Sequence, residues 1–203
     1  MKKKRDTYHH GDLRRALLDA VLALVVERGH AGEVTLREVA RCAGVSHSAP
    51  YRHFAEKGAI LAEVAMEGFA ELSRSLRESR AGVADHEERF FRTGLGYLRF
   101  AEEHPGHFAV MFGPEIQKNR TPELQRAAND TFQLLKELAA DAGIRDVLEA
   151  RRLGTVAWSF LHGLAILTRN HQVPPSVGAT PESLAMLGLQ HLLHSFRAAA
   201  GAR

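Results

Sequence analysis

The stretch from Thr35 to Lys57 reads TLREVARCAGVSHSAPYRHFAEK and decides the fold of this chain. Thr35 can cap a short helix together with Glu38, because this pair satisfies two of the free N–H groups at a helix start. Gly44 then permits a sharp turn, since glycine adopts a positive φ without strain. Two short helices joined by such a turn form a helix-turn-helix, in which the small side chain of Ala40 lets the helices cross closely.

The second half of this stretch is too polar for a helix that is buried on all sides. Its outward positions carry hydrogen-bonding side chains that can reach into the major groove of DNA: Ser46, His47, Ser48, Tyr51, Arg52 and His53. Ser46 can cap a second short helix. Pro50 lacks an N–H and biases Ala49 away from helical geometry. The sequence therefore predicts that this second helix begins late or with a 3-10 turn.

Helical patterns continue on both sides of this stretch. Residues 13–29 place apolar side chains on one face of a helix that ends at Gly29, and a longer helix is expected from about Lys57 to Arg80. Four further helix starts are marked by capping residues: Asp85, Thr121, Asp146 and Thr180. No segment alternates like a strand for long. The sequence predicts an all-α fold of about nine helices.

Charge and composition restrict the class of protein. Residues 1–57 carry 11 Lys and Arg against 7 Asp and Glu, whereas the remainder carries 16 against 17, which suggests a polyanion partner for the N-terminal part. The single cysteine, Cys42, excludes an internal disulfide framework. No signal-peptide pattern follows the basic N-terminus, and the longest uncharged stretch, 153–168, is shorter than the roughly 20 residues that span a bilayer. We expect a cytoplasmic protein without a membrane partner.

Residues 9–65 resemble the DNA-binding region of the tetracycline-repressor (TetR) family. The resemblance lies in Thr35–Ala40 (TLREVA), Ala43–Ser46 (AGVS), Tyr51–Phe54 (YRHF) and Lys57. Residues 97–106 and the WSFLHG segment at 158–163 are similar to one branch of the family's varied C-terminal domains. The resemblance implies a DNA-binding helix-turn-helix domain at 1–57 and a helical effector-binding and dimerisation domain at 58–203.

The family resemblance also implies which residues contact DNA. They are Thr35, Arg37, Ser46, His47, Ser48, Ala49, Tyr51, Arg52, His53 and Lys57. Thr35 and Ser46 would contact phosphates at the starts of the two helices. Tyr51, His53 and Lys57 would make further contacts to the DNA backbone. Arg37 would bind a guanine edge, and the Ala49 methyl would meet a thymine methyl. Phe54 is expected to fill the space between this segment and the following helix.

Aromatic residues are concentrated in 90–112, which holds six of the fourteen in the chain. In the family this region helps to line a ligand cavity, and aromatic walls would favour a small, apolar or aromatic effector. The expected ligand-binding residues are Phe91, Leu95, Leu98, Phe108, Met111, Phe112, Phe132, Leu135, Trp158 and His162.

The last two expected helices, 147–170 and 182–199, carry more apolar residues than one packed neighbour requires, which predicts a homodimer built on a four-helix bundle. No Cys/His spacing fits zinc, and neither a phosphate loop nor a G-x-S-x-G motif is present, so we expect no metal, cofactor or enzymatic activity. The resulting hypothesis is a ligand-released transcriptional regulator that binds a palindromic DNA operator. The alternative is a helical binding module or enzyme in which the helix-turn-helix is only structural.

Overall fold

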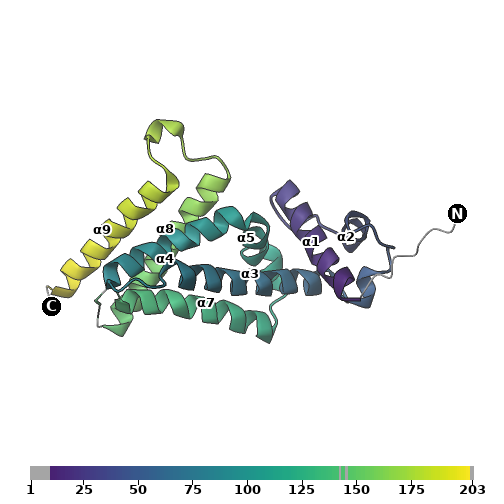
Figure 1. Cartoon of the computed structure of the whole chain (residues 1–203), viewed down its shortest axis with the longest axis horizontal. Coiled ribbons are helices and arrows are strands. Elements are labelled where there is room, and N and C mark those ends of the chain that lie inside the picture. The colour runs from purple at the N-terminus through teal and green to yellow at the C-terminus, as the bar shows by residue number, and fades with distance from the viewer. Residues whose placement is uncertain (1–9, 142, 145, 202–203) are drawn as a thin grey trace. The chain divides into compact units, whose positions relative to one another are not determined.

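The computed structural model describes residues 10–141, 143, 144 and 146–201, and within them every regular element is helical (Figure 1). The α-helices are α1 (His10–Arg28), α2 (Leu36–Cys42), α3 (Lys57–Ser79), α4 (His86–Glu103), α5 (Pro105–Met111), α6 (Pro114–Lys118), α7 (Pro122–Asp141), α8 (Val147–Arg169) and α9 (Pro181–Gly201). Two 3-10 turns, η1 (Pro50–Arg52) and η2 (Pro175–Val177), complete the described elements. The prediction of an all-α fold with about nine helices is confirmed.

Four helix starts form at the predicted capping residues. In each case the side-chain oxygen accepts a hydrogen bond from the backbone N–H three residues further on, at 2.7 Å for Asp85, 2.9 Å for Asp146, 3.1 Å for Thr121 and 3.2 Å for Thr180. Such bonds satisfy N–H groups that have no partner within the helix. The sequence therefore marks where α4, α7, α8 and α9 begin.

The chain packs as two compact units. The first unit contains the residues up to Gly68 together with Pro105–Gln125, and the second contains Phe69–His104 and Arg126–Arg203. This division reflects only which residues pack together, and it does not assign a function to either unit. The division into a DNA-binding domain at 1–57 and an effector-binding domain at 58–203 remains a prediction.

The core of the first unit forms on the apolar face of α1. Leu17, Val21 and Val25 recur at helical spacing and have no exposed surface. The α1 helix packs against both α2 and α5, and Val39 of α2 is fully buried as well. At Gly106, the start of α5 comes so close that an added Cβ would lie 3.2 Å from the carbonyl oxygen of Leu22.

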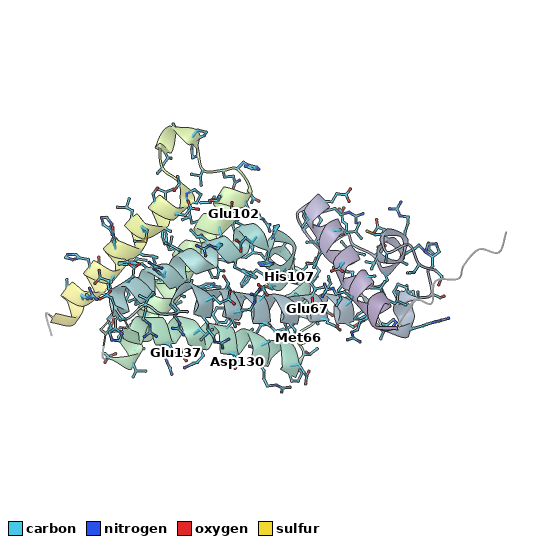
Figure 2. The ribbon with its side chains drawn as sticks, viewed as in Figure 1. Met66, Glu67, Glu102, His107, Asp130 and Glu137 are labelled. Atoms are coloured by element: carbon cyan, nitrogen blue, oxygen red, sulfur yellow. The ribbon has the colours of Figure 1, made fainter. Side chains whose placement is uncertain are left out.

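Ion pairs on the surface join α1 to α3 within the first unit. Arg14 pairs with Glu63, and Arg15 contacts Glu67 at 2.9 Å. Glu67 also lies 3.8 Å from the imidazole of His107 on α5 (Figure 2). Exposed pairs of this kind contribute only about 0–1 kcal/mol each, so they orient the helices more than they stabilise them.

The second unit is organised around α4, which packs against both α8 and α9. Two glycines permit close packing among these three helices. A Cβ on Gly94 of α4 would lie 2.5 Å from the side chain of Leu189, and a Cβ on Gly188 of α9 would lie 2.2 Å from the Phe160 ring. In the same unit, the buried hydroxyls of Ser73 and Thr131 hydrogen-bond at 2.7 Å and connect α3 to α7.

The N-terminus of α2 is held by the predicted capping box and by an arginine that the sequence did not reveal. Glu38 accepts a hydrogen bond from the Thr35 backbone N–H at 3.0 Å, and the Thr35 hydroxyl accepts one from the Glu38 N–H at 3.3 Å. Arg28, at the end of α1, donates to the Glu38 carboxylate at 2.6 Å. These contacts, with the Arg28 hydrogen bond first, lower the pKa of Glu38 to about 2.

Replacing this carboxylate should make stability depend on pH in a defined direction. A folded-state pKa of about 2, below the ordinary value of 4.5, means that ionised Glu38 stabilises the fold above pH 4.5 and that this contribution is lost as the pH falls toward 2. We expect Glu38→Gln to unfold at lower urea concentration than the wild type at pH 7, with the gap closing below about pH 4.5. Glu33→Gln is the control, because only the backbone carbonyl of Glu33 accepts from Arg28. A difference in unfolding urea concentration between wild type and Glu38→Gln that is constant from pH 7 to pH 3 would contradict this role.

Candidate nucleic-acid interface and interior aromatic cluster

The first half of the helix-turn-helix forms as the sequence predicts. α2 ends at Cys42, and Gly44 follows with a φ of +68°. The turn is closed by a hydrogen bond from the Val45 N–H to the Ala40 carbonyl at 2.9 Å. Ala40 is fully buried, as the close crossing at this point requires.

The second half is a run of tight turns instead of a short α-helix that begins at Ser46. The N–H groups of Ala49, Arg52 and His53 each donate to the carbonyl three residues earlier, at 2.9, 3.2 and 3.0 Å. Only Pro50–Arg52 forms a regular element, the 3-10 turn η1. The predicted effect of Pro50 is confirmed, because a residue without an N–H can start such a turn but cannot continue a helix. Ser46 caps no helix, and its hydroxyl lies 3.3 Å from that of Ser48.

Most of the expected DNA-contact residues lie on the surface of the first unit. Exposed side chains are those of Thr35, Arg37, Ser46, His47, Ser48, Tyr51 and Arg52, and His53 is half-buried. The Tyr51 side chain is 60% exposed, whereas large aromatic side chains are usually buried for the most part. Arg41, which the sequence analysis did not select, is exposed too, and its four-residue spacing from Arg37 places both on one face of α2.

Two expected contact residues are placed differently. Ala49 is only 7% exposed, so its methyl group is not accessible to a base edge, contrary to our expectation. The Lys57 ammonium donates to the carbonyls of Gly32 at 2.7 Å and Ala31 at 3.2 Å, in the loop before α2. Phe54 is buried as expected, and the Arg14 guanidinium lies 5.2 Å from its ring centre.

Ion pairing distinguishes the arginines of α1 from those of the helix-turn-helix. Arg14, Arg15 and Arg28 all pair with carboxylates. Three others have no hydrogen bond or ion pair from their guanidinium groups within the described part of the chain: Arg37, Arg41 and Arg52. The basic residues 2–5 lie outside the described residues. Unpaired guanidinium groups therefore lie on the helix-turn-helix surface, where they can bind a phosphate backbone.

A polar group lies within an aromatic cluster of the second unit. Trp158 Nε1 donates to the Tyr97 hydroxyl oxygen at 3.3 Å, and this oxygen lies 2.9 Å from Nδ1 of His162. The Phe132 ring meets Trp158 edge-on, with ring centres 4.9 Å apart. Depending on the imidazole tautomer, either the Tyr97 O–H or the His162 Nδ1–H donates in the contact between these two side chains.

Burial keeps both titratable members of this cluster neutral near pH 7. It raises the pKa of the Tyr97 phenol, and it lowers the pKa of His162, which the positive charge of Arg169 lowers further. The cluster therefore combines aromatic walls with uncharged hydrogen-bonding groups.

The expected ligand-binding residues do not form one group. Phe132, Trp158 and His162 meet in the aromatic cluster together with Tyr97, which the sequence analysis did not select as a ligand-binding residue. The others are distributed as follows: Leu98 is buried in the second unit, Phe91 and Leu95 line a separate groove, and Phe108, Met111 and Phe112 belong to the first unit. The side chain of Leu135 lies outside the described residues. Aromatic clustering in sequence shows that a region is apolar, but it does not show which side of a helix each ring occupies.

Among the described residues, no group of three or more His, Cys, Asp or Glu side chains could hold a metal ion. None of the described helices is long and apolar enough to cross a membrane.

Comparison with known proteins agrees with this geometry. Residues 17–64 match the family model of bacterial regulatory proteins of the tetR family, and residues 90–192 match that of the tetracyclin repressor-like C-terminal domain. No curated protein sequence matches the chain.

Solved structures share the fold over nearly the whole length. A protein of unknown function from Rhodococcus sp. RHA1 is 27% identical with a TM-score of 0.79, covering 94% of this chain and 98% of its own. A TetR-like transcriptional regulator from Rhodococcus sp. RHA1 is 15% identical, with a TM-score of 0.73 over 94% of this chain and 98% of its own. The TetR family transcriptional regulator PfmR from Thermus thermophilus is 21% identical, with a TM-score of 0.68 over 88% of this chain and 97% of its own.

Since the helix-turn-helix and the helical C-terminal part each match a model of the same family, this chain belongs to the TetR family of transcriptional regulators, with an N-terminal DNA-binding domain and a C-terminal ligand-binding domain.

Proposed function

We propose that this protein is a repressor that binds a palindromic operator as a homodimer and leaves it when a small apolar or aromatic molecule binds to the C-terminal domain. The observation that carries this proposal is the separation of charge in the first unit. Every described arginine on α1 is paired with a carboxylate, whereas those on α2 and η1 are unpaired and exposed.

The unpaired residues suit DNA in both position and chemistry. Arg37, near the start of α2, can donate two parallel hydrogen bonds to a guanine edge. Tyr51 and Arg52 project from η1 and can hold phosphates. Lys57 uses two of its three donors on Ala31 and Gly32, so one remains for a phosphate contact. We leave Ala49 out of the proposed surface because it is buried.

The dimer is supported by an apolar stripe on α8. Val156, Phe160, Gly163 and Leu167 follow one another at helical spacing, and Val156 and Leu167 are 41% and 44% exposed. On the neighbouring α9, Leu187 is 53% exposed. A hypothetical Cβ on Gly163 meets nothing within 4 Å, so this position leaves space for a second helix. A copy of the same chain would cover these residues through a two-fold axis.

Ligand binding is supported by the aromatic cluster around Trp158. Its rings provide apolar walls, and Tyr97 and His162 provide neutral hydrogen-bonding groups. This combination favours an uncharged aromatic ligand, because Tyr97, Trp158 and His162 are all neutral and offer hydrogen bonds without a charge. To shift the ratio of the DNA-free state to the DNA-binding state from 1:99 to 99:1, such a ligand must bind the DNA-free state about 5.5 kcal/mol more tightly.

DNA contact can be tested with two arginine variants on an operator selected from random-sequence DNA. We expect Arg37→Ala to lose about 1–3 kcal/mol of discrimination at one base position. We expect Arg52→Ala to weaken binding to all sequences and to reduce the salt slope by about one, because it removes a phosphate contact. Fluorescence anisotropy over a salt series measures both effects. Arg151→Gln on α8 is the control, and equal affinities for all four proteins would exclude this surface as the DNA reader.

The dimer can be tested by placing charge on the stripe. Leu167→Glu together with Leu187→Glu should produce a monomer, since two buried carboxylates per protomer would oppose association. The measurement is sedimentation velocity at micromolar concentration. Val26→Glu introduces the same charge at an exposed apolar residue of the first unit and should leave the dimer intact. A monomeric wild-type protein would refute the dimer and, with it, the palindromic operator.

Ligand release can be followed through Trp158, the only tryptophan in the chain. Aromatic compounds that change its fluorescence would be tested for release of the operator. With such a compound, Tyr97→Phe should require about tenfold more ligand for release, because one hydrogen bond is lost, while operator affinity without ligand is unchanged. Leu148→Ala, at an exposed position on α8, is the control. If Tyr97→Phe and Trp158→Ala both release DNA at the wild-type ligand concentration, the ligand binds elsewhere.

A further inference from the structure

A groove on the second unit involves neither the helix-turn-helix nor the aromatic cluster. Its volume is about 380 Å³, which is within the range of small-molecule sites. Phe91 and Leu95 of α4 and Met186 of α9 provide its apolar surface. The end of α3 forms another part of the lining, with Ser79.

The groove owes its shape to a close approach of α3 and α4 beside it. A Cβ on Gly96 would lie 2.7 Å from the Ser79 hydroxyl, and the Ser75 hydroxyl donates to the Gly96 carbonyl at 3.2 Å. Leu95 and Arg99 line the groove next to this contact.

The charges that line the groove do not all have partners. The Glu88 carboxylate accepts from Arg92 at 2.6 Å, and the Glu78 carboxylate pairs with Arg74 at 3.3 Å. Arg99 is exposed, and its guanidinium makes no hydrogen bond or ion pair within the described part of the chain. The Glu88 carboxylate is thus neutralised within the groove, whereas the exposed Glu78 carboxylate shares Arg74 with Glu71. Arg99 is the lining cation that no carboxylate of the described residues engages.

Helical spacing places this charge at one end of an apolar surface. Arg92, Leu95 and Arg99 occupy one face of α4, and the two arginines are separated by about 10 Å along the helix axis. A flexible thioether such as Met186 adapts to apolar groups of varied shape. A guanidinium binds a carboxylate through two parallel hydrogen bonds.

We propose that this groove is a second ligand site, which binds an amphipathic organic monoanion with its carboxylate on Arg99 and its apolar body on Phe91, Leu95 and Met186. The ligand proposed for this groove is an anion, whereas the ligand proposed for the aromatic cluster is uncharged. It does not depend on that function, because none of its residues belongs to the cluster or to the proposed DNA surface.

The probe for this site is decanoate, a carboxylate with a linear apolar body, used below its micelle concentration with the full-length protein. The chain contains four methionines, so the methyl signals of a protein labelled with ¹³C-methyl methionine can be resolved and that of Met186 assigned with Met186→Leu. We expect decanoate to shift the Met186 signal in a saturable way. Arg99→Gln should weaken this binding about tenfold or more, because a charge-assisted pair is lost.

Three comparisons make the experiment specific. Arg151→Gln removes an exposed arginine from α8 and should leave the decanoate affinity at Met186 unchanged. Decyltrimethylammonium has a similar apolar body with the opposite charge and should shift Met186 far less. Trp158→Ala should abolish ligand release in the proposed function without changing decanoate binding at Met186, which separates failure of one proposal from failure of the other.

Two results would overturn the second site. The first is a Met186 signal that does not move with decanoate up to about 1 mM, where even weak specific binding is detectable. The second is a shift of equal affinity in Arg99→Gln or with the cationic probe, which would show that Met186 reports only nonspecific apolar contact.

Discussion

Burial of one face of α1 is the interaction on which the first unit depends. Leu17, Val21 and Val25 are removed from water completely, and α2 and α5 both pack on this helix. Each such side chain contributes about 1.5–3 kcal/mol when fully buried, far more than the surface ion pairs around it. Once α2 is fixed by this face, its opposite side must point outward. The exposure of Arg37 and Arg41 is a consequence of that packing.

The ion pairs around α1 contribute little to stability, because most of them are exposed. Glu63, Glu67 and Glu38 are each paired with an arginine of α1, and none of them pairs with Arg37, Arg41 or Arg52. The Arg28 contact has a second effect, because it holds ionised Glu38 at the start of α2, where the helix dipole favours negative charge. The helix that carries Arg37 is thereby anchored at the end nearest to its proposed DNA contact.

In the second unit, two faces of α4 line regions with different chemistry. Tyr97 faces the cluster with Trp158 and His162, where every polar group is neutral and partnered. Leu95 and Arg99 line the groove, where a cation has no partner among the described residues. Residues two positions apart on a helix point about 200° apart, so one helix can separate an uncharged site from a charged one. This division is the physical basis for assigning two ligand classes to one domain.

Sequence alone determined the features that depend on local geometry. Capping residues marked four helix starts, apolar spacing identified the buried face of α1, and Pro50 predicted the 3-10 turn in place of a helix start, because each of these effects acts within a few residues of the chain. The tertiary structure alone decided which side chains meet. It buried Ala49, directed Lys57 to the loop before α2, added Tyr97 to the aromatic cluster and moved Phe91 and Leu95 out of the expected pocket into a groove. The physical reason is that partner choice depends on the rotation and approach of helices distant in sequence, which glycines such as Gly94 and Gly96 permit and which no local pattern encodes.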